Sequence, residues 1–313
     1  MKRFVASALL SLGVAANVSS AHAQVKLTKE QMMFYTSDWM GERFPDGRPK
    51  LPESLLERAK TVTIEDVWDY LRAHGYNCQY EGNWQALHID APMTGRALTA
   101  QYMPARPDMV KAIAEEGKRE GRQGGNNMWP INELQIGDVY VADGFGKIIE
   151  GTLIGSNLGS GIAAHSHTGF VFDAGIRDVE ENKEIPNMNG FYRQGDPSFW
   201  KDMTLTSINA PVRIGRATVL PGDLVIAKRD GIIFVPASLA EGAIINAEFT
   251  NLEDAYNFEL NALGKNGAEF EGGWTPSKYD ALAAWIDKHP DKLKMTREEF
   301  NQELTRRKAR SSK

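Results

Sequence analysis

The amino-acid sequence predicts an α/β fold, and three observations lead to that prediction. Strand-like and helix-like segments alternate through the middle of the chain, as they do in α/β domains. Residues 95–104 (GRALTAQYMP) alternate between apolar and polar positions like a strand, and residues 108–119 follow with the spacing of a helix. Residues 168–172 (TGFVF) form an apolar run that is typical of a buried strand.

The first 23 residues predict export from the cytoplasm. Lys2 and Arg3 precede a short apolar stretch and an Ala-His-Ala motif, which together form a secretory signal peptide with cleavage expected between Ala23 and Gln24. We therefore expect a periplasmic or secreted protein. The apolar stretch is too short for a comfortable membrane span, so no span is expected.

The composition of the chain bears on which kinds of molecule it could bind. The chain has 313 residues, 42% hydrophobic and 25% charged, as in an ordinary soluble globular protein. Residues 1–23 carry two of the 36 basic residues and none of the 41 acidic ones, so the remaining chain has a net charge of −7. An acidic chain without a basic block argues against a nucleic-acid partner. Cys78 is the only cysteine, which excludes an intramolecular disulfide, and we expect it to be a small buried residue.

The elements that flank the middle of the chain are an arm, two helices and a helical tail. Residues 24–54 lack periodicity, and we expect an extended arm lying on the body or on a neighbouring subunit. The spacing of apolar residues over 55–71 predicts two amphipathic helices, with Thr63 as an N-cap accepting a hydrogen bond from Asp66. Residues 237–313 have a helical pattern that is interrupted over 266–280.

Two segments of the middle region share one plan and predict β-hairpins. Residues 136–151 (IGDVYVADGFGKIIEG) and 221–236 (PGDLVIAKRDGIIFVP) each contain Gly-Asp, an apolar run, a turn with glycine and a second apolar run. The likeness reflects common hairpin construction, since nothing else in the two segments indicates a duplicated domain.

A glycine-rich stretch, residues 151–167 (GTLIGSNLGSGIAAHSH), is the first candidate binding element. It contains neither a dinucleotide-binding G-x-G-x-x-G motif nor a phosphate loop. It predicts a loop with Ser156 and Asn157 as caps opening a short helix, whose backbone N–H groups form an anion site. A glycine-rich turn without a ligand is the alternative.

Charged residues follow the predicted strand directly. Asp173, Arg177 and Asp178 lie at its end, where a structural Arg–Asp pair that closes a loop is the alternative to a functional site. If the helix near Ser156 leads into the strand that ends at Phe172, its N–H groups and the Arg–Asp pair meet at one end of a sheet, where open α/β sheets bind ligands. Such a site suits an α-keto acid on a divalent metal ion: arginine takes the carboxylate or keto oxygen, and aspartate holds the ion.

Residues 151–178, together with 210–236, resemble the family of the regulator of ribonuclease activity A (RraA) and the class II 4-hydroxy-4-methyl-2-oxoglutarate aldolases. The resemblance covers roughly residues 55–250, with 251–313 as a C-terminal helical extension. It implies an αββα sandwich of the swivelling β/β/α type. It also implies a homotrimer or a hexamer, with active sites between subunits.

The resemblance also implies roles for individual residues. Arg177 corresponds to the arginine that binds the pyruvyl group, Asp178 to the carboxylate that holds Mg²⁺ or Mn²⁺, and Asp173 to an aspartate that orients the same turn. The family's loop whose backbone nitrogens bind the substrate carboxylate corresponds to Gly155, Ser156, Asn157 and Leu158. The aldolases carry an acidic residue at the position of Ser156. Its absence here bears on retro-aldol turnover more than on metal or pyruvate binding.

The expected function is therefore a metal-dependent carbon–carbon lyase acting on an α-keto acid, either a pyruvate-forming aldolase or a decarboxylase of the oxaloacetate type. One alternative is a non-catalytic RraA-like binding or regulatory protein. Another is a lyase that acts on a different enolisable substrate, such as an oxidised sugar acid.

Several other residues could belong to a site. His165 and His167 could join a metal site from a strand, although a place at the helix C-terminus, where an imidazole suits the dipole, is favoured. Arginines that we expect to be exposed, and that could reach a neighbouring subunit's site, are Arg96, Arg106 and Arg213. Trp84 and Trp129 are expected to pack in a core or an interface.

Overall fold

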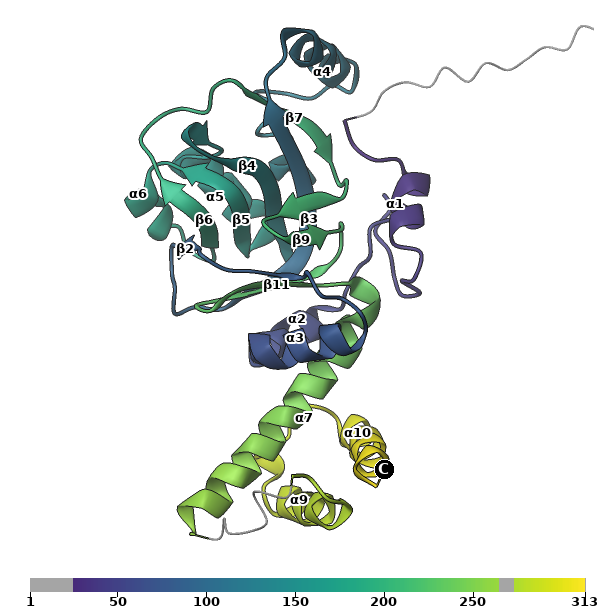
Figure 1. Ribbon diagram of the computed structural model, residues 1–313. Coiled ribbons are helices and arrows are strands. Elements are labelled where there is room, and N and C mark those ends of the chain that lie inside the picture. The colour runs from purple at the N-terminus through teal and green to yellow at the C-terminus, as the bar shows by residue number, and fades with distance from the viewer. Residues whose placement is uncertain (1–24, 265–272, 313) are drawn as a thin grey trace, which may run out of the picture.

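The computed structural model describes residues 25–264 and 273–312, so the predicted signal peptide lies outside the described residues. A large mixed sheet forms the body (Figure 1), with strand order β1-β11-β10-β3-β4-β5-β6-β2, and β7 also pairs with β3. Its strands are β1 (Tyr80–Glu81), β2 (Gln85–Ala86), β3 (Met93–Pro104), β4 (Asp138–Thr152), β5 (Gly169–Ile176), β6 (Asn189–Gly195), β7 (Met203–Ile208), β10 (Leu224–Lys228) and β11 (Gly231–Val235). A separate ribbon contains β8 (Val212–Ile214) and β9 (Ala217–Val219).

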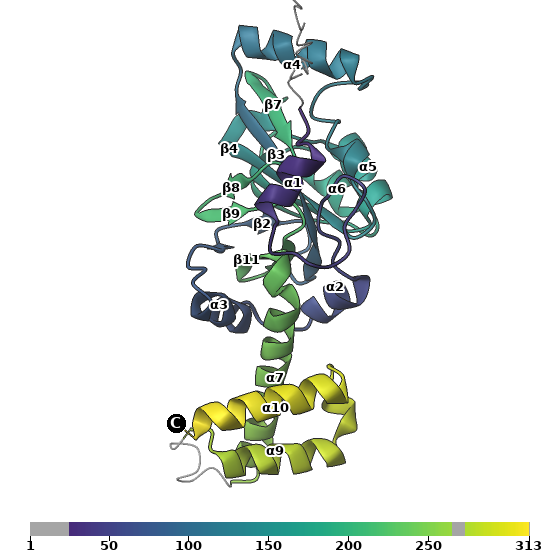
Figure 2. The same cartoon turned by 90° about the vertical axis from the view of Figure 1, so that its right-hand side faces the viewer.

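Helices cover the sheet and extend beyond it. They are α1 (Lys29–Tyr35), α2 (Glu53–Ala59), α3 (Ile64–Ala73), α4 (Pro107–Arg119), α5 (Ser156–Ser166), α6 (Val179–Lys183), α7 (Ala237–Ala262), α9 (Pro276–Lys288) and α10 (Arg297–Ser311), with 3₁₀ turns η1 (Ile131–Glu133) and η2 (Pro290–Lys292). Figure 2 shows α4 at one end of the molecule and α9 and α10 at the other. The predicted α/β class is confirmed. Over the described residues, no helix is both long and apolar enough to cross a membrane.

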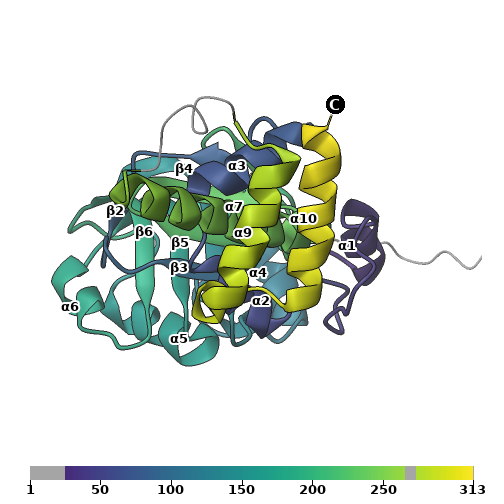
Figure 3. The same cartoon turned by 90° about the horizontal axis from the view of Figure 1, so that it is seen from below.

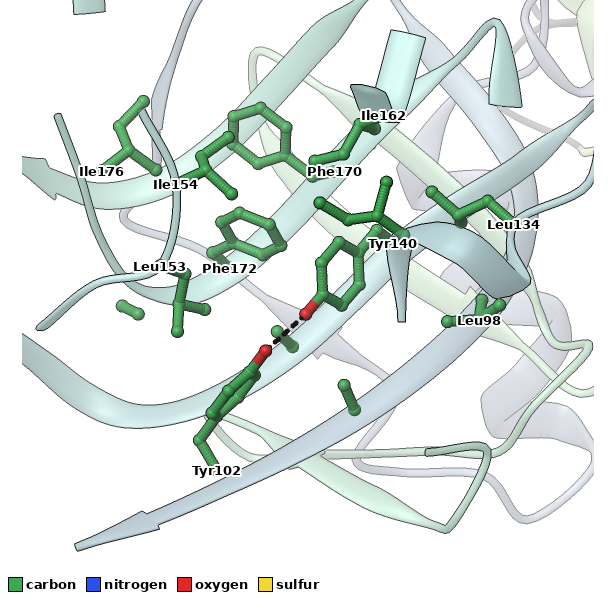
Figure 4. Packing of buried hydrophobic residues seen from close by; sticks show 14 of the residues in the cluster. Leu98, Tyr102, Leu134, Tyr140, Leu153, Ile154, Ile162, Phe170, Phe172 and Ile176 are labelled. Carbon is green, nitrogen blue, oxygen red and sulfur yellow. Dashed lines mark hydrogen bonds between the residues drawn. The ribbon is translucent and has the colours of Figure 1, made fainter. Parts of the chain in front are cut away.

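Four parallel strands, β3 to β6, form the centre of the sheet. Side chains alternate between its two faces, so Phe170 and Phe172 of β5 join one apolar core, whereas Val171 joins another that is covered by β8 and β9. Figure 4 shows the first core, in which the hydroxyls of Tyr102 and Tyr140 are hydrogen-bonded at 2.7 Å. Burial raises the pKa of both phenols, so both stay neutral.

Most of the predicted elements are confirmed. Strand β3 and helix α4 contain residues 95–104 and 108–119, and Thr63 is the N-cap of α3, with its side chain accepting from the backbone N–H of Asp66. The hairpin over 221–236 is β10 and β11.

The predicted hairpin over 136–151 is wrong. This segment is one strand, β4, which pairs in parallel with β3 on one side and β5 on the other. The turn-like glycines lie where the register with β5 shifts, between Asp143 and Lys147, and Phe145 adopts a positive φ of 46° there. The glycines that suggested a hairpin turn therefore mark an irregularity within one strand. The chain does not fold back on itself here, because β4 pairs with β3 and β5 instead.

The arm before residue 55 is not wholly extended, because it contains helix α1, which begins with a capping box between Thr28 and Gln31.

A buried ion-pair cluster fixes the arm to the sheet. Arg48 of the arm and Arg96 of β3 both pair with Asp138 of β4, at 2.7 and 3.2 Å, and each of the three side chains is at most 2% exposed. The Phe44 ring lies 4.5 Å from the Arg48 guanidinium carbon. Arg96, expected at the surface, is therefore buried.

The C-terminal extension has its own apolar core, built from the second half of α7 with α9 and α10. Seen from below, α9 and α10 run side by side across α7 (Figure 3). Helix α7 is continuous across residue 250, where the sequence suggested a domain boundary. Arg58 of α2 links the two parts, since it binds Glu248 of α7 at 2.6 Å and Glu299 of α10 at 2.9 Å.

The predicted burial of Cys78, Trp84 and Trp129 can also be compared with the structure. Cys78 was expected to be buried, but it is exposed because it lies in the connection between α3 and β1 rather than in a core element. Trp129 is 5% exposed and belongs to the first core, and Trp84 packs against the core covered by β8 and β9. Both tryptophans pack as predicted.

Candidate active site at the carboxyl end of the sheet

Arg177 and Asp178 follow directly after β5 and meet the start of α5. The backbone N–H of Arg177 donates to the carbonyl of Ile154 at 3.0 Å, which holds the two segments together. The backbone N–H of Ser156 donates to Asp178 Oδ2 at 3.1 Å, and Arg177 Nε lies 3.9 Å from the same oxygen. The predicted meeting of the helix start and the Arg–Asp pair is therefore present. Both side chains remain about one-third exposed, at 37% and 32%, so they are open to a ligand.

Gly155 makes this close approach possible. A Cβ at this position would lie 2.3 Å from Asp178 Oδ2 and 2.9 Å from Arg177 Nε, which is closer than atoms pack. Gly155 is the N-cap of α5 and no side chain caps the helix, although Ser156 and Asn157 were expected as caps. Because the first N–H groups of a helix have no intrahelical acceptor, and that of Ser156 is used by Asp178, those of Asn157 and Leu158 are the donors left for a ligand.

The Asn182 side chain stabilises the turn that carries Asp178. Asp178 has left-handed backbone angles, with φ 56° and ψ 47°, which aspartate and asparagine tolerate better than most residues. The fully buried Asn182 amide donates to the carbonyls of Arg177 at 3.0 Å and Asp178 at 2.8 Å. Asn182 was not predicted, since a polar residue in a short acidic helix gives no local signal of this role.

A pocket of about 100 Å³ lies beside Arg177. Arg177 and Asn157 supply part of its polar wall, and Leu158 belongs to its apolar wall. Its remaining lining residues are Asn127, Thr152, Leu153, Ile154, Gly155, Phe199 and Trp200. The sequence did not predict Asn127, Phe199 or Trp200, which come from loops distant in the chain.

A larger cavity, of about 630 Å³, lies at the other end of the parallel strands, next to the starts of β3, β4 and β6. Neither Arg177 nor Asp178 lines it. Open α/β sheets bind ligands at the carboxyl ends of their strands. The small pocket is therefore the better candidate, in spite of its size.

Asp173 does not join the other predicted site residues. It alternates with Phe172 along β5, so its side chain lies on the opposite face of the sheet, the face covered by β8 and β9. There it binds Arg193 Nε at 2.6 Å, and Arg193 in turn binds Glu81 at 3.1 Å. The expectation that Asp173 orients the Arg177–Asp178 turn is thus corrected: its contacts fix β6 to the segment that contains β1.

The remaining candidates lie apart from the pocket. His165 is in the last turn of α5, with Nδ1 2.8 Å from the carbonyl of Gly161, and His167 is the left-handed C-cap, so the favoured helix-end position is confirmed. Within the described ranges, no group of three histidine, cysteine, aspartate or glutamate side chains could hold a metal ion. Arg106 and Arg213 are exposed.

Comparisons with known proteins bear on the family of the chain. The profile of the RraA-like family, described as Aldolase/RraA, matches residues 63–234, more than half of the chain. The chain belongs to the RraA-like family. A protein of Halalkalibacterium halodurans, named as a candidate 4-hydroxy-4-methyl-2-oxoglutarate aldolase, is 31% identical over 126 residues. That match covers 39% of this chain and 57% of the relative, so the chain spans little more than half of the relative's length.

Solved structures agree with the RraA-like fold. Streptomyces coelicolor RraAS2, described as an unusual member of the RNase ES inhibitor RraA protein family, has a TM-score of 0.56 and 26% identity, covering 68% of this chain and 98% of that one. An uncharacterised protein of Pseudomonas syringae has the same TM-score at 20% identity, covering 72% and 95%, and it supports the fold alone. The arm and the far C-terminal helices lie outside the residues that the family profile matches.

Proposed function

We propose that the protein is a divalent-metal-dependent carbon–carbon lyase that acts on an α-keto acid, as a pyruvate-forming aldolase, an oxaloacetate-type decarboxylase or both. The observation that carries this proposal is that Arg177 and the start of α5 line one small pocket, and that Asp178 lies next to both, with its Oδ2 3.9 Å from Arg177 Nε and 3.1 Å from the backbone nitrogen of Ser156. The relative from Halalkalibacterium halodurans supports the same reaction class by its name. Export and assembly into a trimer or hexamer remain predictions.

The donor set fits Mg²⁺ or Mn²⁺. Asp178 keeps one carboxylate oxygen besides the Oδ2 that accepts from Ser156, and its side chain is 32% exposed. Mg²⁺ commonly takes one or two protein carboxylates and keeps several waters, so a single carboxylate is sufficient. Asp178 would hold the ion, which would supply Lewis acidity toward the keto oxygen.

The chain's own residues would do the remaining work. The planar Arg177 guanidinium would bind the substrate carboxylate or keto oxygen, and the N–H groups of Asn157 and Leu158 would donate to the carboxylate. The bond between C3 and C4 of the substrate would break, and its electron pair would become the enolate of pyruvate. C4 would leave as an aldehyde or ketone in the aldol case, with its hydroxyl proton passing to water, and as CO₂ from oxaloacetate. Arg177 would stabilise the developing negative charge, and a proton from solvent would complete the methyl group.

Substitutions at Arg177 and Asp178 separate this proposal from a structural ion pair. Asp178→Asn tolerates the left-handed backbone but loses the charge, so we expect metal affinity to fall at least tenfold. Arg177→Lys keeps the charge and loses the planar fork, so turnover should fall about 100-fold with metal affinity nearly unchanged. Calorimetry with Mn²⁺ and an oxaloacetate decarboxylation assay test both, with melting temperature as the control. A parent protein that binds no divalent metal, or variants equal to it in both assays, would refute the proposal.

Alanine at Gly155 should damage the site and spare the fold. The added Cβ would displace Asp178 Oδ2 and Arg177 Nε, which are ends of partly exposed side chains that can move cheaply. We expect at least a tenfold loss of turnover with less than about 1 kcal/mol of destabilisation. Gly161→Ala in the same helix is the matched control, because its Cβ would have ordinary contact with Ile131 at 3.5 Å. Equal turnover in the two variants would contradict the role of this glycine.

A second candidate function is ligand binding without turnover. Ser156 favours it, because Ser156 stands where the aldolases carry an acidic residue that handles water or a proton. Pyruvate and Mn²⁺ binding without turnover of oxaloacetate or of 4-hydroxy-2-keto acids would support this second function over the first.

A further inference from the structure

An exposed aromatic ring lies over the Arg177 side chain. Phe199, in the connection between β6 and β7, is 71% exposed, and its ring centroid lies 5.3 Å from the Arg177 guanidinium carbon. A guanidinium over an aromatic face is held there by the charge distribution of the ring. Single exposed apolar side chains are common on protein surfaces, and Phe199 differs from them because it lines the pocket and its ring lies next to Arg177.

Hydrogen bonds fix the backbone that carries Phe199. The Ser198 N–H donates to Asp196 Oδ1 at 2.9 Å, and Ser198 Oγ accepts from the N–H of Glu150 at 2.6 Å. On either side of Phe199, the Ser198 carbonyl accepts from Thr152 Oγ1 at 2.5 Å, and the Lys201 N–H donates to the Glu150 carbonyl at 2.8 Å. The loop is therefore tied to the end of β4, so the ring of Phe199 is presented from a fixed position.

The next residue, Trp200, closes the apolar side of the pocket. Its ring meets the buried Tyr102 ring edge-on at 6.1 Å, and it packs against the first core. Among the lining side chains, Arg177 carries the positive charge and the aromatic pair with Leu158 supplies apolar surface. A volume of about 100 Å³ is that of about three water molecules, which suits a three-carbon acid.

We propose that Phe199 is a positioning residue for Arg177, and that Phe199 and Trp200 restrict the site to α-keto acids whose C3 carries no substituent other than the part that is cleaved off. This inference rests on the proposed function, and it specifies which α-keto acids the site accepts. Phe199 holds the guanidinium toward the pocket, so the substrate meets a preorganised fork. The part of the substrate that is cleaved off extends beyond the pocket and is not restricted by this pair.

Three variants test the positioning role. Phe199→Leu keeps apolar bulk and loses the aromatic face, so we expect the KM for oxaloacetate and the Kd for pyruvate with Mg²⁺ to rise about threefold to tenfold, with kcat near that of the parent. Phe199→Tyr keeps the ring and should restore both values to within about twofold. Phe258→Leu on α7 is the matched control, because Phe258 is 69% exposed and should change neither value. Melting temperatures should be the same in all four proteins, since neither ring is buried.

A second measurement tests the size limit. The parent should bind pyruvate and reject 3,3-dimethyl-2-oxobutanoate in calorimetry, because C3 of that acid carries two methyl groups besides the one at the position of the cleaved part. Phe199→Ala should bind 3,3-dimethyl-2-oxobutanoate measurably. Phe199→Leu with parental KM and Kd, or a parent that binds both acids equally, would overturn this inference while the proposed function stands. A parent that neither binds pyruvate nor turns over oxaloacetate would overturn the proposed function, and this inference with it.

Discussion

Asp138→Ala is expected to lower the free energy of unfolding by about 3–5 kcal/mol, because it leaves two buried guanidinium groups without their counter-charge. Arg48 and Arg96 are 1% and 2% exposed, and both pair with this one carboxylate. Asp138 also accepts from the backbone N–H of Gln135 at 2.9 Å, so the substitution leaves a third donor unpaired. Denaturant unfolding, followed by circular dichroism, measures the loss.

The matched control for this prediction is Asp90→Ala. Asp90 pairs with Arg229 on the surface, where their side chains are 79% and 63% exposed, and such pairs contribute about 0–1 kcal/mol. If Asp138→Ala and Asp90→Ala destabilise the protein equally, the buried cluster does not anchor the arm. A selective loss in Asp138→Ala would show that the buried cluster, which joins the arm to β3 and β4, stabilises the protein.

Arg58→Met should lower the free energy of unfolding by about 3 kcal/mol. The variant leaves the carboxylate of Glu248, whose side chain is 1% exposed, in the interior without its cation.

Denaturant unfolding of the Arg58→Met variant, beside the double variant Arg58→Met/Glu248→Gln, tests this account. The double variant should recover most of the loss, since it removes the lone charge. Arg106→Met is the control, because Arg106 pairs with Asp108 at the surface with side chains 73% and 67% exposed. A loss of stability that is unchanged in the double variant would point to lost packing instead.

The candidate site was predictable where it depends on neighbouring elements. The loop at Gly155, the helix and strand β5 follow one another in the chain, so their ends had to meet, and Arg177 and Asp178 lie at that meeting point. The same local logic could have placed Asp173 correctly, because it alternates with Phe172 and must face the other side of the sheet.

The rest depends on contacts between distant segments. Phe199 and Asn127 reach the pocket from loops that are 22 and 50 residues from Arg177, and neither loop has a periodic pattern. The segment 136–151 has the local chemistry of a hairpin, yet its neighbours are β3 and β5. Charge pairs such as Arg58 with Glu248 join residues 190 positions apart, so composition shows that the charges exist without showing which ones meet.

Helix α7 sets a fixed separation between the sheet and the C-terminal helices α9 and α10. Its 26 residues span about 39 Å, and proline is absent from them. Its one glycine, Gly242, lies against Tyr70, where a Cβ would come within 2.3 Å of the hydroxyl, so it serves close packing and is no hinge. The first half of the helix packs on the body and the second half on α9 and α10. Helices α9 and α10 are therefore kept at a constant distance and angle from the sheet, and α7 acts as a rigid spacer.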